Sequence, residues 1–253
     1  MESSVENPPP LDRMLRNRLT AVFLAAFEDP AQRDALDWLS LYCELAPGWN
    51  NGIVPVAALL KARSGASRVA LQEAVGSLGG ILQWQPCESA GIAPEPVLLA
   101  CLAPVTAMVR LYLMVLHEAD GRRATLDAME PLSRTVTEAA FCFNAGLFFE
   151  AHEHLEHRWV ALPRGPVRRF VQGIIQISVG LYHARRGSYH GAVNQLAKGL
   201  EKLGGLSGSV MGLDCGQLMR EVDAFRRRLV VRGSDDRGPA RLEEMPRIRM
   251  MNL

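Results

Sequence analysis

Apolar residues recur at helical spacing along most of this 253-residue chain. In the C-terminal half they predict four helices, at residues 136–159, 166–186, 189–203 and 217–230, with an interruption of the first near Asn144. The helix at 166–186 is apolar nearly all round, which is typical of a helix that its neighbours bury. The pattern therefore predicts an all-α helical bundle in this half of the chain.

The N-terminal half shows the same periodicity in shorter segments. It predicts helices at residues 11–27, 31–45, 54–62, 67–78 and 104–119, and two short strands at 81–85 and 97–102. Helices followed by a two-stranded hairpin follow the element order of a winged helix-turn-helix module. We therefore predict a mainly α protein whose mostly helical N-terminal region is winged-helix-like with a small β-hairpin.

Composition indicates where the parts of the chain begin and end. Residues 1–10 end in three prolines and predict a flexible lead-in, and residues 232–253, rich in glycine, proline and charge, predict a mobile tail. Between them we expect an N-terminal domain at 11–125 and a C-terminal helical bundle at 126–231.

Charge is divided unevenly between the two halves. Residues 1–135 hold 11 basic and 15 acidic side chains, a net charge of −4, whereas the remainder carries +5. DNA affinity depends mainly on neutralising phosphates, and the predicted helix at 67–78 has one arginine, Arg68, and one glutamate, Glu73. We therefore expect no DNA binding by the winged-helix-like region. We expect this region instead to contact a protein partner or to form a homo-oligomer.

Cysteines and apolar segments predict a cytoplasmic protein without a membrane anchor. The five cysteines are never spaced as CxxC, which argues against both a disulfide framework and a thiolate zinc site. The first residues lack the basic and apolar regions of a signal peptide. Residues 97–116 are long and apolar, but Pro104 and Arg110 interrupt them. We interpret them as a buried strand followed by a core helix.

The most specific patterns in the chain are three runs: FNAGLFFEAHEHLEHRW at 143–159, QGIIQ at 172–176 and HARRG at 183–187. Over about residues 140–205 they resemble a bacterial helical family known as domain of unknown function 309, with its FNxGxxxEAHExLExxW motif. The chain departs from that pattern at Ser188 and Tyr189, where an asparagine is usual, and at His154 and His157. The resemblance implies a compact all-α domain and no established activity.

Independently of the resemblance, the spacing of the polar and ionisable residues indicates a candidate site around His152. One face of the helix carries an apolar stripe made of Phe148, His152, Leu155 and Trp159. Glu156 lies beside that stripe, one turn after His152. Three further polar residues are expected off the stripe: Glu150, Glu153 and His157.

The following buried helix also carries polar groups, which need partners. Gln172, Gln176 and His183 share a stripe, and an unsatisfied buried polar group costs about 1–3 kcal/mol. We expect this stripe to face His152 and Glu156. A second stripe has little bulk and would let a neighbouring helix approach closely; it consists of Gly173, Ile177, Gly180 and Ala184.

Three interpretations of the cluster remain open. In the first, the cluster is a structural hydrogen-bond network. In the second, it binds a divalent metal ion through His152, Glu156 and His183, although HExxE lacks the second histidine of the HExxH motif. In the third, it is a small-molecule site. In the last case Glu153 or Glu156 would act as a general base polarised by His152, all three being catalytic. Ligand contacts would come from Gln172, Gln176 and Arg169.

We therefore expect a binding or enzymatic module centred on this cluster. The alternative is a regulatory or protein-interaction module in which the cluster is only structural. The arginines near the ends of the two helices are expected to be solvated, with an anionic ligand as the alternative. The residues leave open the substrate, the identity of any metal and whether a reaction takes place.

Overall fold

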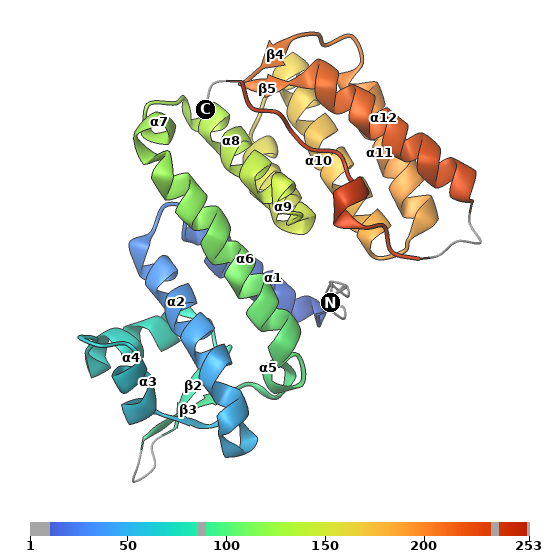
Figure 1. Cartoon of the computed structure of the whole chain (residues 1–253). Coiled ribbons are helices and arrows are strands. Elements are labelled where there is room, and N and C mark those ends of the chain that lie inside the picture. The colour runs from blue at the N-terminus through green and yellow to red at the C-terminus, as the bar shows by residue number, and fades with distance from the viewer. Residues whose placement is uncertain (1–10, 86–89, 234–237, 252–253) are drawn as a thin grey trace. The chain divides into compact units, whose positions relative to one another are not determined.

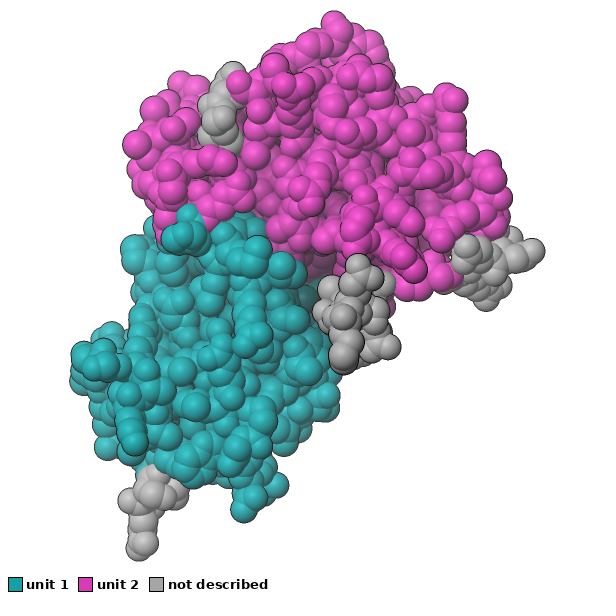
Figure 2. Space-filling view, in the orientation of Figure 1, with its two compact units in different colours: residues 1–117 teal, residues 118–253 magenta. Residues whose placement is uncertain are grey.

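The structure is a computed structural model that describes residues 11–85, 90–233 and 238–251, so the predicted lead-in at 1–10 lies outside the described residues. As predicted, the protein is mainly α: the described chain has twelve α-helices and two small antiparallel sheets. It forms two compact units, residues 1–117 and 118–253, shown in Figure 1 and Figure 2. We call them unit 1 and unit 2.

Unit 1 begins with helices at the predicted positions. Its helical elements are α1 (Arg13–Ala25), α2 (Pro30–Leu45), the 3-10 turns η1 (Ala46–Gly48) and η2 (Asn50–Gly52), α3 (Val56–Ala62), α4 (Arg68–Ser77) and α5 (Pro96–Ala100). Aspartates start the first two helices, because the carboxylates of Asp12 and Asp29 accept hydrogen bonds from otherwise unpaired backbone amides.

A three-stranded antiparallel sheet completes unit 1. Its strands are β1 (Val54–Pro55), β2 (Leu82–Gln85) and β3 (Gly91–Pro94), in the order β1-β3-β2. The predicted strand at 97–102 is wrong, since α5 occupies most of it. Pro96 at the first helical position favours a helix there, and a short apolar run does not distinguish a strand from a buried helix.

Helix α6 (Leu102–Gly121) is the core helix that the apolar segment predicted. Its buried face includes Val105, Val109 and Tyr112, and the Tyr112 ring stacks on Phe23 with centroids 4.1 Å apart. Among the described helices it alone is long and apolar enough to cross a membrane, and 39% of its most apolar window is buried inside the protein. A core helix of a soluble protein has the same properties.

Unit 2 is a series of helices, each packed against the next: α8 on α9, α9 on α10, α10 on α11 and α11 on α12 (Figure 1). The helices are α7 (Arg123–Asp127), α8 (Pro131–Asn144), α9 (Phe148–Trp159), α10 (Pro166–Arg185), α11 (Tyr189–Leu203) and α12 (Cys215–Arg232). The small-residue stripe brings α10 and α11 together, because a Cβ on Gly173 would lie 2.7 Å from Cδ2 of Leu203.

The last part of unit 2 differs from the expected mobile tail. A short hairpin of β4 (Ser209–Val210) and β5 (Leu213–Asp214) precedes α12, and the 3-10 turn η3 (Leu242–Glu244) follows it. Ala240, Met245 and Ile248 are buried. These apolar residues are scattered among charges and prolines, so the segment lacks a periodic pattern and yet packs on the bundle.

Candidate functional site

The turn between α8 and α9 is shaped by the asparagine and glycine of the FNxG run. Gly146 has a φ of +80°, and a Cβ there would lie 2.8 Å from Cδ1 of Leu242. The Asn144 amide donates to the carbonyl of Ile248 at 2.9 Å and accepts from its backbone N–H at 2.8 Å. These two motif residues therefore fix the turn and hold the C-terminal segment against it.

Three side chains of α9 bring ligand atoms together on one turn of helix. One atom from each of His152, Glu153 and Glu156 lies within 4.8 Å of the other two. Nε2 of His152 is 3.1 Å from Oε1 of Glu153. Two ligands of one cation lie at most about 4–5 Å apart, which is twice the usual ligand–cation distance. The spacing of this His/Glu group therefore fits a single bound ion.

The His/Glu group is enclosed at one end and open at the other. The His152 side chain is 13% exposed, and its ring meets the Phe149 ring edge-on with centroids 4.9 Å apart. The Glu153 side chain is 43% exposed, and Glu156 is also exposed. Apolar neighbours thus hold the imidazole, while solvent can reach both carboxylates.

The structure gathers some of the predicted site residues and not others. Glu153 joins His152 and Glu156, whereas His183, the predicted third metal ligand, is not in the group. The His183 ring lies against α11, where a Cβ on Gly191 would come within 2.9 Å of its Cγ. Burial and the charge of Arg186 lower the pKa of His183, which favours its neutral ring.

The predicted glutamine stripe lies on α10, which packs against α9. Gln172 and Gln176 are both half-buried. Oε1 of Gln176 and Nδ1 of His152 are buried without a hydrogen-bond partner in the described part of the chain. The Gln176 acceptor on α10 and the His152 ring nitrogen on α9 are therefore both unsatisfied, although the two helices pack together. In the expected structural hydrogen-bond network, these two atoms would have been paired.

Arg169, which was predicted to contact a ligand, forms hydrogen bonds at the C-terminal end of α11. Its guanidinium donates to the carbonyls of Glu201 and Lys202, at 2.9 and 3.1 Å, where α11 finishes. The neighbouring Arg168 likewise donates to the carbonyl of Trp159 at 2.9 Å and lies over its ring. Both cations complement the negative end of a helix dipole, which favours a structural role for them.

A second polar cluster, not anticipated from the sequence, is buried between α8 and α9. The Glu138 side chain is 2% exposed and accepts hydrogen bonds at 2.8 Å from Nε2 of His154 and Nε of Arg134. Burial raises the pKa of Glu138, but the two hydrogen bonds outweigh it and hold the pKa below its usual range. The i,i+4 spacing of Arg134 and Glu138 was the signal available in the sequence.

Glu150 belongs to the same interior, although it was expected off the apolar stripe of α9. It is 3% exposed, and its charge, after burial itself, contributes to raising the pKa of the Cys142 thiol well above the usual value. Cys142 is fully buried and stays protonated, so it is not a nucleophile. The apolar stripe did not predict this burial, because α9 is covered on two sides, by α8 and by α10, and a single stripe describes only one of them.

Unit 2 is thus a helical bundle with a His/Glu group on α9. Residues 136–195 match the model of a family described as a domain of unknown function (DUF309), which confirms the resemblance seen in the motifs. The uncharacterized protein YpuF of Bacillus subtilis (strain 168) is 38% identical over 74 residues, covering 28% of this chain. The chain spans 42% of the length of that relative. No solved structure matches.

Proposed function

We propose that unit 2 binds a divalent transition-metal ion through His152, Glu153 and Glu156. The observation that carries the proposal is the convergence of one nitrogen and two carboxylate ligand atoms within 4.8 Å. Two carboxylates close together repel each other, and a dication would offset their charge. The imidazole nitrogen favours zinc, iron or manganese over magnesium and calcium, which prefer oxygen ligands.

Three ligands from a single turn of helix would occupy one side of the ion. The other coordination positions would be open to water or to a substrate atom, as in sites that carry out metal-assisted reactions. The buried Nδ1 of His152 would carry the ring proton, leaving Nε2 free to bind the ion. A ligating histidine commonly donates that second N–H to a nearby acceptor, and the buried Oε1 of Gln176 has no donor among the described residues.

Manganese titration followed by electron paramagnetic resonance tests the site directly. The full chain, purified without a chelator or a nickel column, should remove about one equivalent of free Mn²⁺ signal. Glu156→Gln and His152→Ala should each weaken binding by about tenfold or more, since each removes a ligand. Glu201→Gln, an exposed glutamate on α11, is the matched control and should bind as the wild type does. Equal binding by all four proteins would contradict the proposal.

Thermal melts separate a metal site from a purely structural cluster. In the metal site, chelator lowers the melting temperature of the wild type, and His152→Ala stays folded and indifferent to chelator. In a structural network, His152→Ala lowers the melting temperature strongly whether or not chelator is present, because its partners lose their hydrogen bonds. The second result would overturn the proposal.

A second function is proposed for unit 1, as a winged-helix-like protein-interaction module. The observation in its favour is the topology: α2, α3 and α4 precede the β2–β3 hairpin, and β1 adds a third strand beside β3. Val69 on α4 is 64% exposed and offers an apolar contact. If the partner is a second copy, light scattering should give twice the chain mass for the wild type and a lower mass for Val69→Lys. A monomer at every concentration would contradict self-association.

A further inference from the structure

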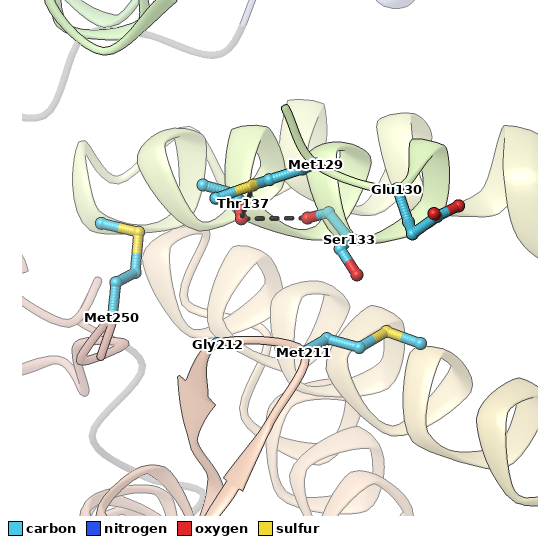
Figure 3. Close-up of a pocket in the computed structure, with 7 residues that line it drawn as sticks. All are labelled: Met129, Glu130, Ser133, Thr137, Met211, Gly212 and Met250. Atoms are coloured by element: carbon cyan, nitrogen blue, oxygen red, sulfur yellow. Dashed lines mark hydrogen bonds between the residues drawn. The ribbon is translucent and has the colours of Figure 1, made fainter. Parts of the chain in front are cut away.

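A pocket of about 260 Å³ lies in unit 2 and contains none of the His/Glu group. Its lining comes from three segments: the start of α8, the β4–β5 turn and the C-terminal segment (Figure 3). The lining residues are Met129, Glu130, Ser133, Thr137, Met211, Gly212 and Met250. Ligand pockets usually measure about 300–1,000 Å³, so this one is slightly smaller than most and would hold only a small ligand.

Backbone pairing fixes the wall opposite α8. Met250 forms an antiparallel bridge with Leu213, and the amide of Asp214 donates to the carbonyl of Arg249 at 3.0 Å. The amide of Met251 donates to the carbonyl of Gly212 at 2.8 Å. The C-terminal segment therefore pairs with β5 through a single bridge, and the Met250 side chain lines the pocket.

Met211 occupies a turn position that its side chain does not favour. The two residues between β4 and β5, Met211 and Gly212, have φ values of +49° and +81°. A two-residue hairpin turn with positive φ at both positions favours asparagine followed by glycine. Methionine there is a local cost in stability, and such costs often accompany a function. Here the side chain at the strained position lines the pocket.

The lining is apolar and adaptable, with polar groups on one side. Three flexible thioether side chains, Met129, Met211 and Met250, can adjust to the shape of an apolar ligand. The Thr137 hydroxyl already donates a hydrogen bond within α8, to the carbonyl of Ser133 at 2.9 Å, as the dashed line in Figure 3 shows. The Ser133 hydroxyl points from α8 toward the hairpin (Figure 3).

We propose that this pocket binds a small, uncharged, apolar molecule that carries one hydrogen-bond donor. The apolar body would lie among the three methionines, and the donor would bond the Ser133 hydroxyl or the Glu130 carboxylate. Glu130 is the one ionisable side chain in the lining, so an anionic ligand would meet an unfavourable charge. The ligand class follows from the lining alone and is independent of the proposed metal site.

Indole is a suitable probe, because it has an apolar body and a single N–H donor. The full chain labelled with ¹³C at its methionine methyl groups should give resonances for its ten methionines. On titration with indole, those of Met129, Met211 and Met250 should shift with one shared dissociation constant. Those of Met14 and Met114, which are exposed elsewhere, should not move. Indole-3-acetate, which adds a carboxylate, should bind several-fold more weakly.

Met211→Asn distinguishes ligand binding from folding. Asparagine suits the turn, so the melting temperature should stay the same or rise, while loss of the Met211 thioether from the pocket lining should weaken indole binding about tenfold. Met14→Ala is the control and should bind indole as the wild type does. The proposal is overturned if the three resonances stay fixed at millimolar indole, or if folded Met211→Asn binds indole as tightly as the wild type. Equal binding of indole-3-acetate would overturn the assigned ligand class.

Discussion

The two ring nitrogens of His152 lie in different surroundings, and this difference limits what the residue can do. Nε2 is 3.1 Å from the Glu153 carboxylate, whereas Nδ1 is buried without a partner among the described residues. A neutral imidazole has one donor and one acceptor. Whichever tautomer is present, Nδ1 stays unsatisfied, which costs about 1–3 kcal/mol. The expected hydrogen-bond network is therefore incomplete at Nδ1, and Nε2 is the nitrogen that the proposed metal site uses.

Substitutions at Leu155 and Glu153 distinguish the buried face of α9 from the face that carries candidate ligand residues. Leu155 is fully buried, so Leu155→Ala should lower the free energy of unfolding by about 2–5 kcal/mol. Glu153→Gln keeps the shape of a partly exposed side chain and should change it by less than about 1 kcal/mol. Urea denaturation of both variants, with chelator present, measures the difference. Unfolding of Glu153→Gln would show that the faces of α9 are assigned wrongly.

Glu138 and His183 together predict how stability depends on pH. Each has a pKa below its usual value in the folded state, so the unfolded chain binds more protons as the pH falls. The free energy of unfolding should therefore decrease below about pH 6.5, the usual pKa of His183, and again below about 4.5, the usual pKa of Glu138. Urea midpoints measured from about pH 8 to about pH 3 follow both steps.

Glu138→Gln isolates the lower step. The substitution removes the charge that Arg134 and His154 share, so it should cost about 3 kcal/mol or more at neutral pH. It should also flatten the decline below about pH 4.5. Glu201→Gln, on the exposed face of α11, should retain both steps. A wild-type decline that persists unchanged in Glu138→Gln would exclude Glu138 as its cause.

Long segments with a regular apolar period predicted the helices correctly. Short features without such a period were not predicted. The predicted helix at 189–203 coincides with α11, because its apolar positions are regular and Gly204 follows it. The hairpin of β4 and β5 has only two residues in each strand, and its turn uses Met211 in place of the usual asparagine. Neither feature could be recognised from the sequence.

The candidate site was predictable only where its residues share one helical turn. The pairing of His152 with Glu156 follows from their i,i+4 spacing on α9, whereas Glu153 was expected off the stripe and not as a metal ligand. Whether His183 joins them depends on how α10 is rotated against α9, which spacing along one helix does not determine. The burial of Glu138 and Glu150 depends in the same way on the packing of α8 against α9.

Close approach of α10 and α11 can be tested at Gly199. Alanine usually stabilises a helix by about 1 kcal/mol relative to glycine. At Gly199, however, a Cβ would lie 2.9 Å from the backbone oxygen of Gly173 and 2.6 Å from Cγ1 of Ile177. Overpacking costs about 1–3 kcal/mol, so Gly199→Ala should be destabilising overall when measured by urea denaturation. Gly76→Ala on α4, where nothing lies within 4 Å, should be neutral or stabilising.

The two units differ in charge as well as in architecture. Unit 1 holds 8 basic and 11 acidic side chains, a net charge of −3. Several of its arginines are also paired: Arg18 with Glu95, Arg63 with Asp34 and Arg110 with Glu44. Arg68 lies over the Trp84 ring. Few cations of unit 1 are therefore available to neutralise phosphates.

Unit 1 should consequently give no specific binding to duplex DNA. Fluorescence anisotropy with a labelled duplex should show no change at micromolar full-length protein in about 150 mM salt. Any binding at lower salt should be independent of sequence and should disappear as salt is added, because it would arise from the basic excess of unit 2. Lys61→Ala and Arg68→Ala, which remove cations from unit 1, should leave that low-salt binding unchanged. A sequence-specific, salt-sensitive complex that either substitution abolishes would show that unit 1 binds DNA.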